Sequence, residues 1–158
     1  IDDRCKKNSW FKLKKKPDIL ILEGWCVGAK PENSKSLKRP INVLEKNADN
    51  KKIWRSYVNN QLKSKYSKLF DQLDSLLYLK AKNFKLLKRW RLKQEKKLKM
   101  KSGTKKNSKI MNEKEVETFM MTYQRITQNM FKYTPKYSSA VIDLNEKHQI
   151  KKVRFKHA

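Results

Sequence analysis

One short aliphatic run constrains the fold more than any other feature of this chain. Residues 19–22 read Ile-Leu-Ile-Leu, and the run stops at once at Glu23-Gly24-Trp25. Four consecutive aliphatic residues bounded by a turn signal predict a short strand covered on both faces. Ligands of open α/β sheets lie at the carboxyl ends of such strands. Glu23 is therefore either a carboxylate facing a magnesium ion or a reacting hydroxyl, or a solvated turn residue. The pattern leaves both interpretations open.

The rest of the chain alternates between helical and strand patterns. Apolar residues recur every three to four positions over 52–73 and 83–100, which predicts helices. A capping box of Asn112 and Glu115 predicts a third helix that ends before Pro135. Further strands are expected at 74–81, 139–144 and 150–155, and 29–50 is expected to be a loop or an insertion. This order predicts an α/β fold with a parallel sheet flanked by helices.

The charge of the chain raises the question of an anionic partner. It has 41 Lys+Arg against 15 Asp+Glu, a formal net charge of +26. Such an excess is typical of nucleic-acid or membrane-surface binding. The excess is mostly lysine, however, and it is spread over nearly every segment, whereas arginine is the residue that reads phosphates bidentately. We favour a lysine-rich surface on an ordinary fold, with a nucleic-acid-binding basic module as the alternative.

The remaining compositional signals are negative. The longest apolar run falls far short of the ~20 residues that a spanning helix needs, so no membrane association is expected. No signal peptide is visible in the sequence. Cys5 and Cys26 have neither CxxC spacing nor a matching histidine pattern. We therefore expect a reducing, cytoplasmic location and no structural metal.

The arginines of the second helix are the other candidates for chemistry. Arg89 and Arg91 flank Trp90, and two arginines leaning over a cleft can clamp transferring phosphates. The alternative is a solvated basic helix with Trp90 as its core anchor, and periodicity alone favours it. Arg125 could reach the same cleft or pair with a surface carboxylate, and its local sequence favours the pairing. The sequence contains no Gly-x-x-x-x-Gly-Lys-Ser/Thr and no Gly-x-Gly-x-x-Gly.

Taken in order, four motifs resemble a known family. They are residues 18–25 (Asp-Ile-Leu-Ile-Leu-Glu-Gly-Trp), 74–80, 90–95 (Trp-Arg-Leu-Lys-Gln-Glu) and 111–125 (Met-Asn-Glu-Lys-Glu-Val, then Phe119 to Arg125). Together they resemble the C-terminal part of P-loop kinases of the D-glycerate 3-kinase type, relatives of phosphoribulokinase, uridine kinase and bacterial pantothenate kinase. The resemblance extends from about residue 2 to residue 155. It implies a P-loop NTPase-like sheet that is incomplete at the N-terminus, within a single kinase domain of which 1–158 is the C-terminal portion.

The resemblance also implies an activity and roles for particular residues. The family transfers a phosphoryl group from ATP, with Mg2+, to the hydroxyl of a small molecule. By similarity, Glu23 would lie near the magnesium ion through a water or activate the acceptor, and Arg89 and Arg91 would be lid arginines that close on the ATP phosphates. Asp3 and Arg4 match a stretch near the acceptor, although Asp2 replaces its glycine, and Trp25 belongs to the same substrate side.

Two departures from the family pattern limit what is carried over. The tight turn of the lid, expected within 83–110, is replaced by a longer segment from Gly103 to Met111. The phosphate-binding loop of the family would precede residue 1, so we expect the longer protein to be active and these 158 residues alone to be inactive. A noncatalytic kinase relative is a further alternative. The acceptor, whether glycerate, another hydroxy acid or a nucleoside-like alcohol, and the oligomeric state stay open.

Overall fold

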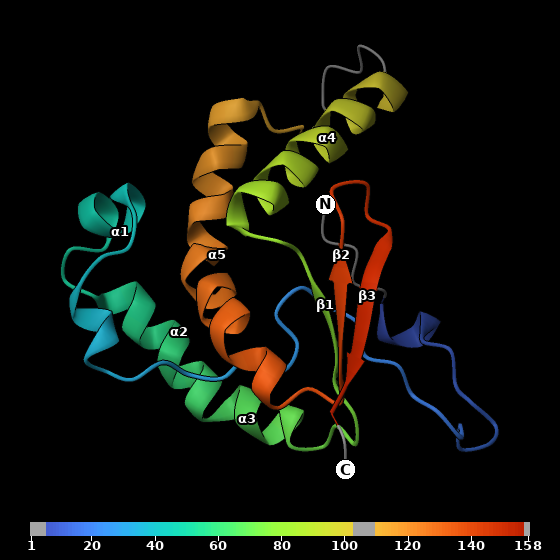
Figure 1. Ribbon diagram of the computed structural model, residues 1–158. Helices are drawn as coiled ribbons and strands as arrows, with labels where there is room; N and C mark the ends of the chain where they lie inside the picture. The colour runs from blue at the N-terminus through green and yellow to red at the C-terminus, as the bar shows by residue number, and fades with distance from the viewer. Residues whose placement is uncertain (1–5, 103–109, 157–158) are drawn as a thin grey trace.

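The computed structural model describes residues 6–102 and 110–156, in which a three-stranded sheet lies beside a group of helices (Figure 1). The strands are β1 (Leu77–Lys80), β2 (Ala140–Leu144) and β3 (Ile150–Phe155), in the order β1-β2-β3. β1 and β2 are parallel, with Leu77 opposite Ala140, and β3 is antiparallel to β2. The predicted α/β class is confirmed, with a small mixed sheet in which β3 is the expected edge strand.

The helices account for the periodic segments of the sequence. They are α1 (Val43–Ala48), α2 (Ile53–Lys63), α3 (Lys65–Phe70), α4 (Phe84–Ser102) and α5 (Glu113–Tyr133), with short 3-10 turns at Lys7–Ser9, Ser36–Lys38 and Thr134–Lys136. The single helix predicted over 52–73 is instead two helices. They meet at Ser64, whose hydroxyl donates to the Asn60 carbonyl oxygen at 2.7 Å, a local bond that competes with regular helix geometry.

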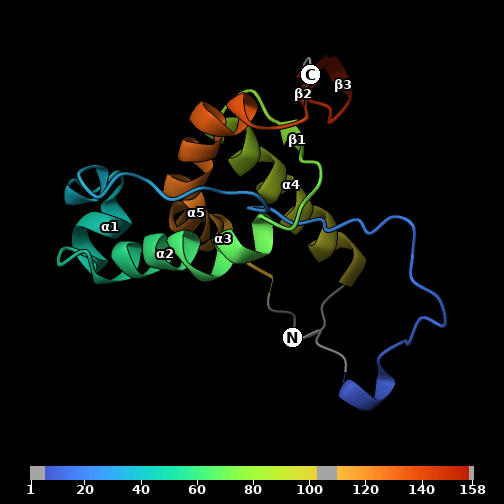
Figure 2. The same cartoon turned by 90° about the horizontal axis from the view of Figure 1, so that it is seen from below.

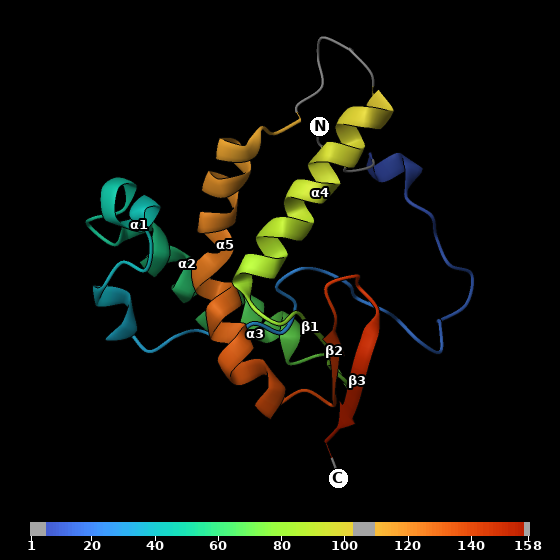
Figure 3. The ribbon, with the colours of Figure 1, turned by 45° about the horizontal axis from the view of Figure 1, so that its top comes forward.

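α5 is the central helix and contacts both α4 and α1 (Figure 3). Its predicted capping box is confirmed: the Asn112 side chain accepts from the Glu115 backbone N–H, and Glu115 accepts from the Asn112 N–H. Val116 and Met120 are essentially inaccessible on its inner face. Towards its other end, Met130 packs with Ala29 and Leu62 in a small apolar cluster. The apolar residues of α5, spaced three or four positions apart, therefore form the helix face that packs in the core.

The strand predicted at residues 19–22 is wrong for the described structure. These residues are extended but form no strand, and Leu20 and Ile21 are each 85% exposed. In Figure 2 the segment runs as an irregular stretch past the helices. A strand needs a hydrogen-bonded neighbour, and in the described ranges β1 pairs with β2 alone. Residues 19–22 therefore add no strand to the described sheet, and its parallel pair is β1–β2, connected through α4 and α5.

The segment 29–50 is mostly irregular, as expected, but it contains α1. Asn42 caps this helix by accepting from the Glu45 backbone N–H at 2.9 Å. The Asn42 amide also donates to the Met121 carbonyl oxygen at 3.0 Å and to Gln124. These bonds fasten the segment to α5. In the part of the chain that the structure describes, no helix is long and apolar enough to cross a bilayer.

Candidate functional site

A surface hollow of about 560 Å3 lies at the carboxyl ends of the two parallel strands. α4 begins shortly after β1, and residue 148 follows the end of β2, so both elements bring side chains to the same edge of the sheet. Its lining consists of Trp25, Leu87, Trp90, Arg91, Lys93, Gln94, Lys97 and His148. Three of these residues are cations and none of them is acidic. Ligands of α/β sheets bind at this edge, and the lining is suited to an anion.

Arg91 is the most firmly held cation of the hollow. One of its Nη atoms donates to Glu95 one helical turn later, and the other donates to the Gln94 side chain at 2.7 Å. Its guanidinium lies 5.3 Å from the ring centroid of Phe119, a cation–π distance. Each Nη carries two hydrogens, so one N–H on each atom stays available to an anion.

Trp25 forms the aromatic wall of the hollow. Its ring stacks on Tyr123 with centroids 4.7 Å apart and planes inclined by 16°, and it lies 6.0 Å from Phe119. Both partners are on α5. The structure therefore brings together Trp25 and Arg91, two residues that lie far apart in the sequence, which the resemblance assigns to the substrate side and to the ATP phosphates respectively.

A second aromatic pair closes the other end of the hollow. Trp90 stacks on His148 at 4.0 Å, and its indole N–H donates to the Glu146 carbonyl oxygen at 2.9 Å. His148 has a left-handed φ of 66° within the tight turn that joins β2 to β3, where its N–H donates to the Asn145 carbonyl oxygen at 3.1 Å. His148 is thus a turn residue, as its position in the sequence indicates, and its ring also contributes to the lining.

The other predicted site residues lie apart from this lining. Arg89 is on the flank of α4 and pairs with Glu146 at 3.2 Å, with both side chains more than half exposed. Glu23 is exposed, two residues before Trp25, and has no paired cation among the described residues. Asp3 and Arg4 lie outside the described residues. No group of three or more His, Cys, Asp or Glu gathers as a metal site within residues 6–102 and 110–156.

Arg125 belongs to a buried ion cluster on the opposite flank of α5. Its Nε and Nη2 donate to Glu45 at 2.7 and 2.6 Å, and Nη1 lies 3.4 Å from Glu32. The carbonyl oxygens of Ser36 and Arg39 accept its two remaining N–H groups. The expected carboxylate pairing is confirmed, but the partner Glu45 is buried rather than on the surface. With all five N–H groups used, Arg125 has no donor left for a ligand.

The carboxylates of this cluster have pKa values shifted in opposite directions. Burial raises the pKa of Glu32, and the nearby Arg125 offsets this only in part. Burial also acts to raise the pKa of Glu45, but the hydrogen bonds from Arg125 and the Ile41 N–H, together with the charges of Arg125 and Arg55, lower it overall. Glu45 is therefore the principal counter-ion of Arg125.

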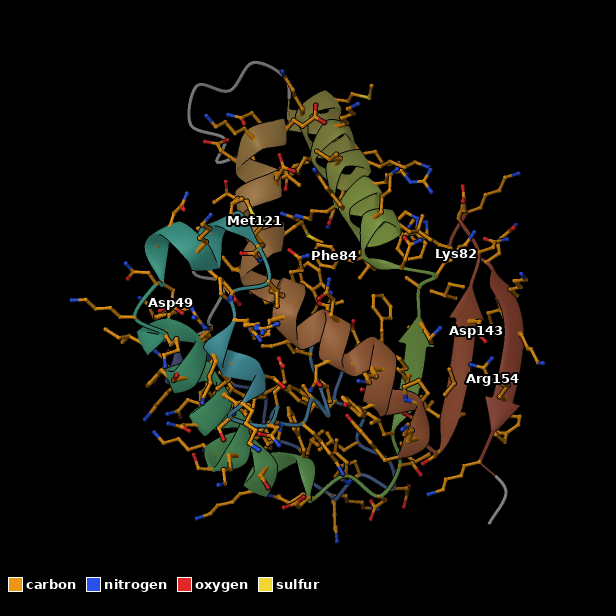
Figure 4. The ribbon with its side chains drawn as sticks, turned by 60° about the vertical axis from the view of Figure 1, so that its left-hand side comes forward. Asp49, Lys82, Phe84, Met121, Asp143 and Arg154 are labelled. Atoms are coloured by element: carbon orange, nitrogen blue, oxygen red, sulfur yellow. The ribbon has the colours of Figure 1, made fainter. Side chains whose placement is uncertain are left out.

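Two further residues singled out in the sequence have structural roles. Asp143 on β2 pairs with Arg154 of β3 at 2.6 Å and lies 3.7 Å from Lys80 of β1 (Figure 4). Its carboxylate therefore links the three strands. Burial raises the pKa of Cys26 to about 11, so its thiol is protonated and unreactive at neutral pH.

Sequence reasoning missed the residues that support the hollow from behind. Phe119 and Tyr123 contact Arg91 and Trp25, and these contacts depend on how α4 and α5 cross. Glu95 is 5% exposed and contacts Arg91. Its spacing of four residues from Arg91 is the signal that could have identified it.

Comparisons with known proteins bear on the fold of the chain and on its relatives. No family model matches the chain. Over 123 residues the chain is 33% identical to the uncharacterized kinase mug58 of Schizosaccharomyces pombe, an alignment that covers 77% of the chain and 41% of that protein. The structure of the chain is similar to that of a D-glycerate 3-kinase from Cryptococcus neoformans var. grubii, with a TM-score of 0.70. The predicted resemblance to kinases of the D-glycerate 3-kinase type is confirmed as a likeness of fold, and the relative aligned by sequence is named as a kinase.

This kinase likeness has a defined extent. The structural match covers 89% of the chain at 21% sequence identity and 50% of the Cryptococcus protein. The chain thus spans half or less of the length of the two relatives. What it shares with the solved kinase is the fold of this portion, including the small mixed sheet and the helices beside it.

Proposed function

We propose that this chain is part of an ATP-dependent kinase that transfers a phosphoryl group to the hydroxyl of a small molecule. The observation that carries the proposal is the hollow at the carboxyl ends of β1 and β2, where Arg91, Lys93 and Lys97 surround a space without acidic lining. Support also comes from the two relatives, which are both described as kinases.

The cations of the hollow would stabilise the charge of the transferring phosphoryl group. Phosphoryl transfer depends mainly on positioning and on electrostatic stabilisation of the transition state. Arg91 would contact the ATP phosphates with its two available N–H groups. Arg89 would approach the nucleotide from the flank of α4, where it is exposed. Lys93 and Lys97 would add positive potential at the same edge.

Glu23 would serve the magnesium ion or the acceptor. Mg2+ is usually held by one or two carboxylates together with waters and substrate phosphates, and a single exposed carboxylate two residues before Trp25 fits that donor set. Glu23 would hold the ion through a water or accept the proton of the acceptor hydroxyl. Trp25, with Asp3 and Arg4, would line the acceptor side. Bound Mg2+ would neutralise charge on the phosphates.

A phosphate-binding loop is the part of this machinery that the 158 residues do not contain. We therefore expect these residues by themselves to transfer no phosphoryl group. The activity should be sought in the longest polypeptide that carries them. Glycerate, other hydroxy acids and nucleosides are the acceptors to compare, with ADP release as the measurement.

The decisive variants are Arg91→Gln and Glu23→Gln in that polypeptide. Each should lower kcat by on the order of 10²-fold or more, because each removes a group that acts on the reacting centre. Arg154→Gln is the control, since Arg154 pairs with Asp143 within the sheet and should leave kcat unchanged. Near-normal turnover of Arg91→Gln would refute the role of the hollow, and near-normal turnover of Glu23→Gln would remove Glu23 from the mechanism.

A further inference from the structure

Glu95 is a buried carboxylate on a helix whose other charged residues are mostly exposed. Glu95 is 5% exposed, whereas the neighbouring lysines of α4 are exposed to solvent. Burying a carboxylate is costly unless its oxygens are hydrogen-bonded or paired. One oxygen of Glu95 accepts from Arg91 Nη2, and the other accepts from the Met111 backbone N–H at 3.1 Å. Glu95 thus bridges a cation of the hollow and a backbone sixteen residues away.

The Met111 contact connects α4, which carries the cations of the hollow, to the start of α5, which supports its aromatic wall. Met111 immediately precedes Asn112, the N-cap of α5. Phe119 under Arg91 and Tyr123 behind Trp25 are both on α5. The position of the α4 cations relative to the aromatic wall therefore depends on the bridge through Glu95.

The guanidinium of Arg91 is fixed on more than one side. Glu95 and Gln94 hold its Nη atoms, and Phe119 lies against it. Its Nε is buried and has no hydrogen-bond partner among the described residues. The Nε–H of a solvated arginine would donate to water. The buried Nε therefore shows that packing, and not solvent, surrounds this part of the guanidinium.

We propose that Glu95 is a positioning residue that fixes Arg91 for contact with an oligophosphate and joins it to the start of α5. The inference rests on the proposed function, whose phosphate site it completes. A positioning role and a simple charge effect predict opposite changes in phosphate affinity when the charge of Glu95 is removed. Loss of the Glu95 charge makes the hollow more positive, so a charge effect alone would tighten phosphate binding. A positioning role predicts weaker binding.

The test is a double-mutant cycle with inorganic triphosphate as the probe, measured by calorimetry on the longest polypeptide that carries the chain. Glu95→Gln should weaken binding about tenfold or more, because one of the two donors then meets an amide N–H instead of an oxygen. In an Arg91→Gln background the same change should have little further effect. Glu95→Asp keeps the charge but is too short to reach both donors, and should weaken binding as well.

The matched control is Glu117→Gln. Glu117 of α5 pairs with Lys88 of α4 at 2.6 Å, so it joins the same two helices through a carboxylate and a cation, but neither residue lines the hollow. Triphosphate affinity should be unchanged in this variant. With ATP as the substrate, Glu95→Gln should lower kcat more than it raises KM.

Several outcomes would overturn the inference. One is that Glu95→Gln binds triphosphate as tightly as the parent protein or more tightly. Another is that the effects of the Glu95 and Arg91 changes on affinity are additive. A third is that the parent protein shows no measurable triphosphate binding. Failure of both Glu95 variants to fold would also overturn it, because the role of Glu95 would then be structural. Absence of phosphoryl transfer to every acceptor would refute the proposed function instead, and the triphosphate cycle would still decide the role of Glu95.

Discussion

Residues 17–24 and the flank formed by α1, α2 and α5 distribute their side chains in opposite ways. The first segment is aliphatic, yet Ile19 is 79% exposed. The second contains Arg125 and Glu45, charged residues that are each only 9% exposed. The difference shows that burial in this fold follows from available partners rather than from hydropathy. Arg125 finds two carboxylates and two carbonyl oxygens, whereas the aliphatic run finds no neighbouring strand among the described residues.

The largest expected effect is on the charged flank. Arg125→Met would leave Glu32 and Glu45 without their cation in a buried site and should lower the free energy of unfolding by about 3–5 kcal/mol. Urea denaturation measures this. Arg154→Met is the comparison, because Arg154 also pairs with a carboxylate but its side chain is 45% exposed; there the loss should stay below about 1 kcal/mol. Equal losses of unfolding free energy in Arg125→Met and Arg154→Met would contradict the predicted difference between a buried and an exposed ion pair.

The next effect compares apolar residues of the two regions. Met120→Ala would open a cavity at a residue that is 1% exposed and should cost about 2–5 kcal/mol. Leu20→Ala, at a residue 85% exposed, should change the stability of the 158-residue chain by less than about 0.5 kcal/mol. Thermal and urea unfolding of both variants provide the measurement. A large loss for Leu20→Ala would show that residues 17–24 are packed in solution.

A smaller effect is expected at the junction of the two regions. Gly28 has a φ of +75°, and an added Cβ would lie 2.8 Å from a methyl group of Leu76. Gly28→Ala should therefore cost about 1–3 kcal/mol. Gly24→Ala is the control within the exposed segment, because Gly24 has no left-handed φ and its added Cβ would meet one methyl group, that of Val27 at 2.9 Å. Urea denaturation measures both variants. Equal urea midpoints would contradict the predicted difference in stability between Gly28→Ala and Gly24→Ala.

The finest distinction is between the two carboxylates of Arg125. The folded-state pKa of Glu45 is lowered, so its stabilising contribution is present above the unfolded pKa of about 4.3 and is lost as the pH falls below it. The folded-state pKa of Glu32 is raised, so its protonation favours the folded state as the pH falls towards about 4.3. Glu45→Gln should flatten the decline of stability in acid, and Glu32→Gln should steepen it. Urea midpoints between pH 7 and pH 3 measure the slope of stability against pH in the parent and in both variants, and a change of slope in the same direction in the two variants would reject the assignment.

The sequence by itself determined the helices and strands that carry their own local signals. The capping box at Asn112, the apolar stripe of α5 and the strands β1, β2 and β3 depend on periodicity and on short-range hydrogen bonds. The α/β class follows from their order. The motifs around Trp25 and Trp90 also sufficed to identify the kinase likeness.

Tertiary structure decided what depends on distant partners. Residues 19–22 have the composition of a buried strand, but a strand forms only beside another strand, and none pairs with them in the described residues. The sequence indicated a carboxylate partner for Arg125 but not that the partner is buried, and periodicity left Arg91 open between a phosphate clamp and a solvated helix. The fold gives Arg125 five acceptors and leaves Arg91 with two available donors beside Trp25. That difference arises because α5 packs on α1 along one flank and on α4 along the other.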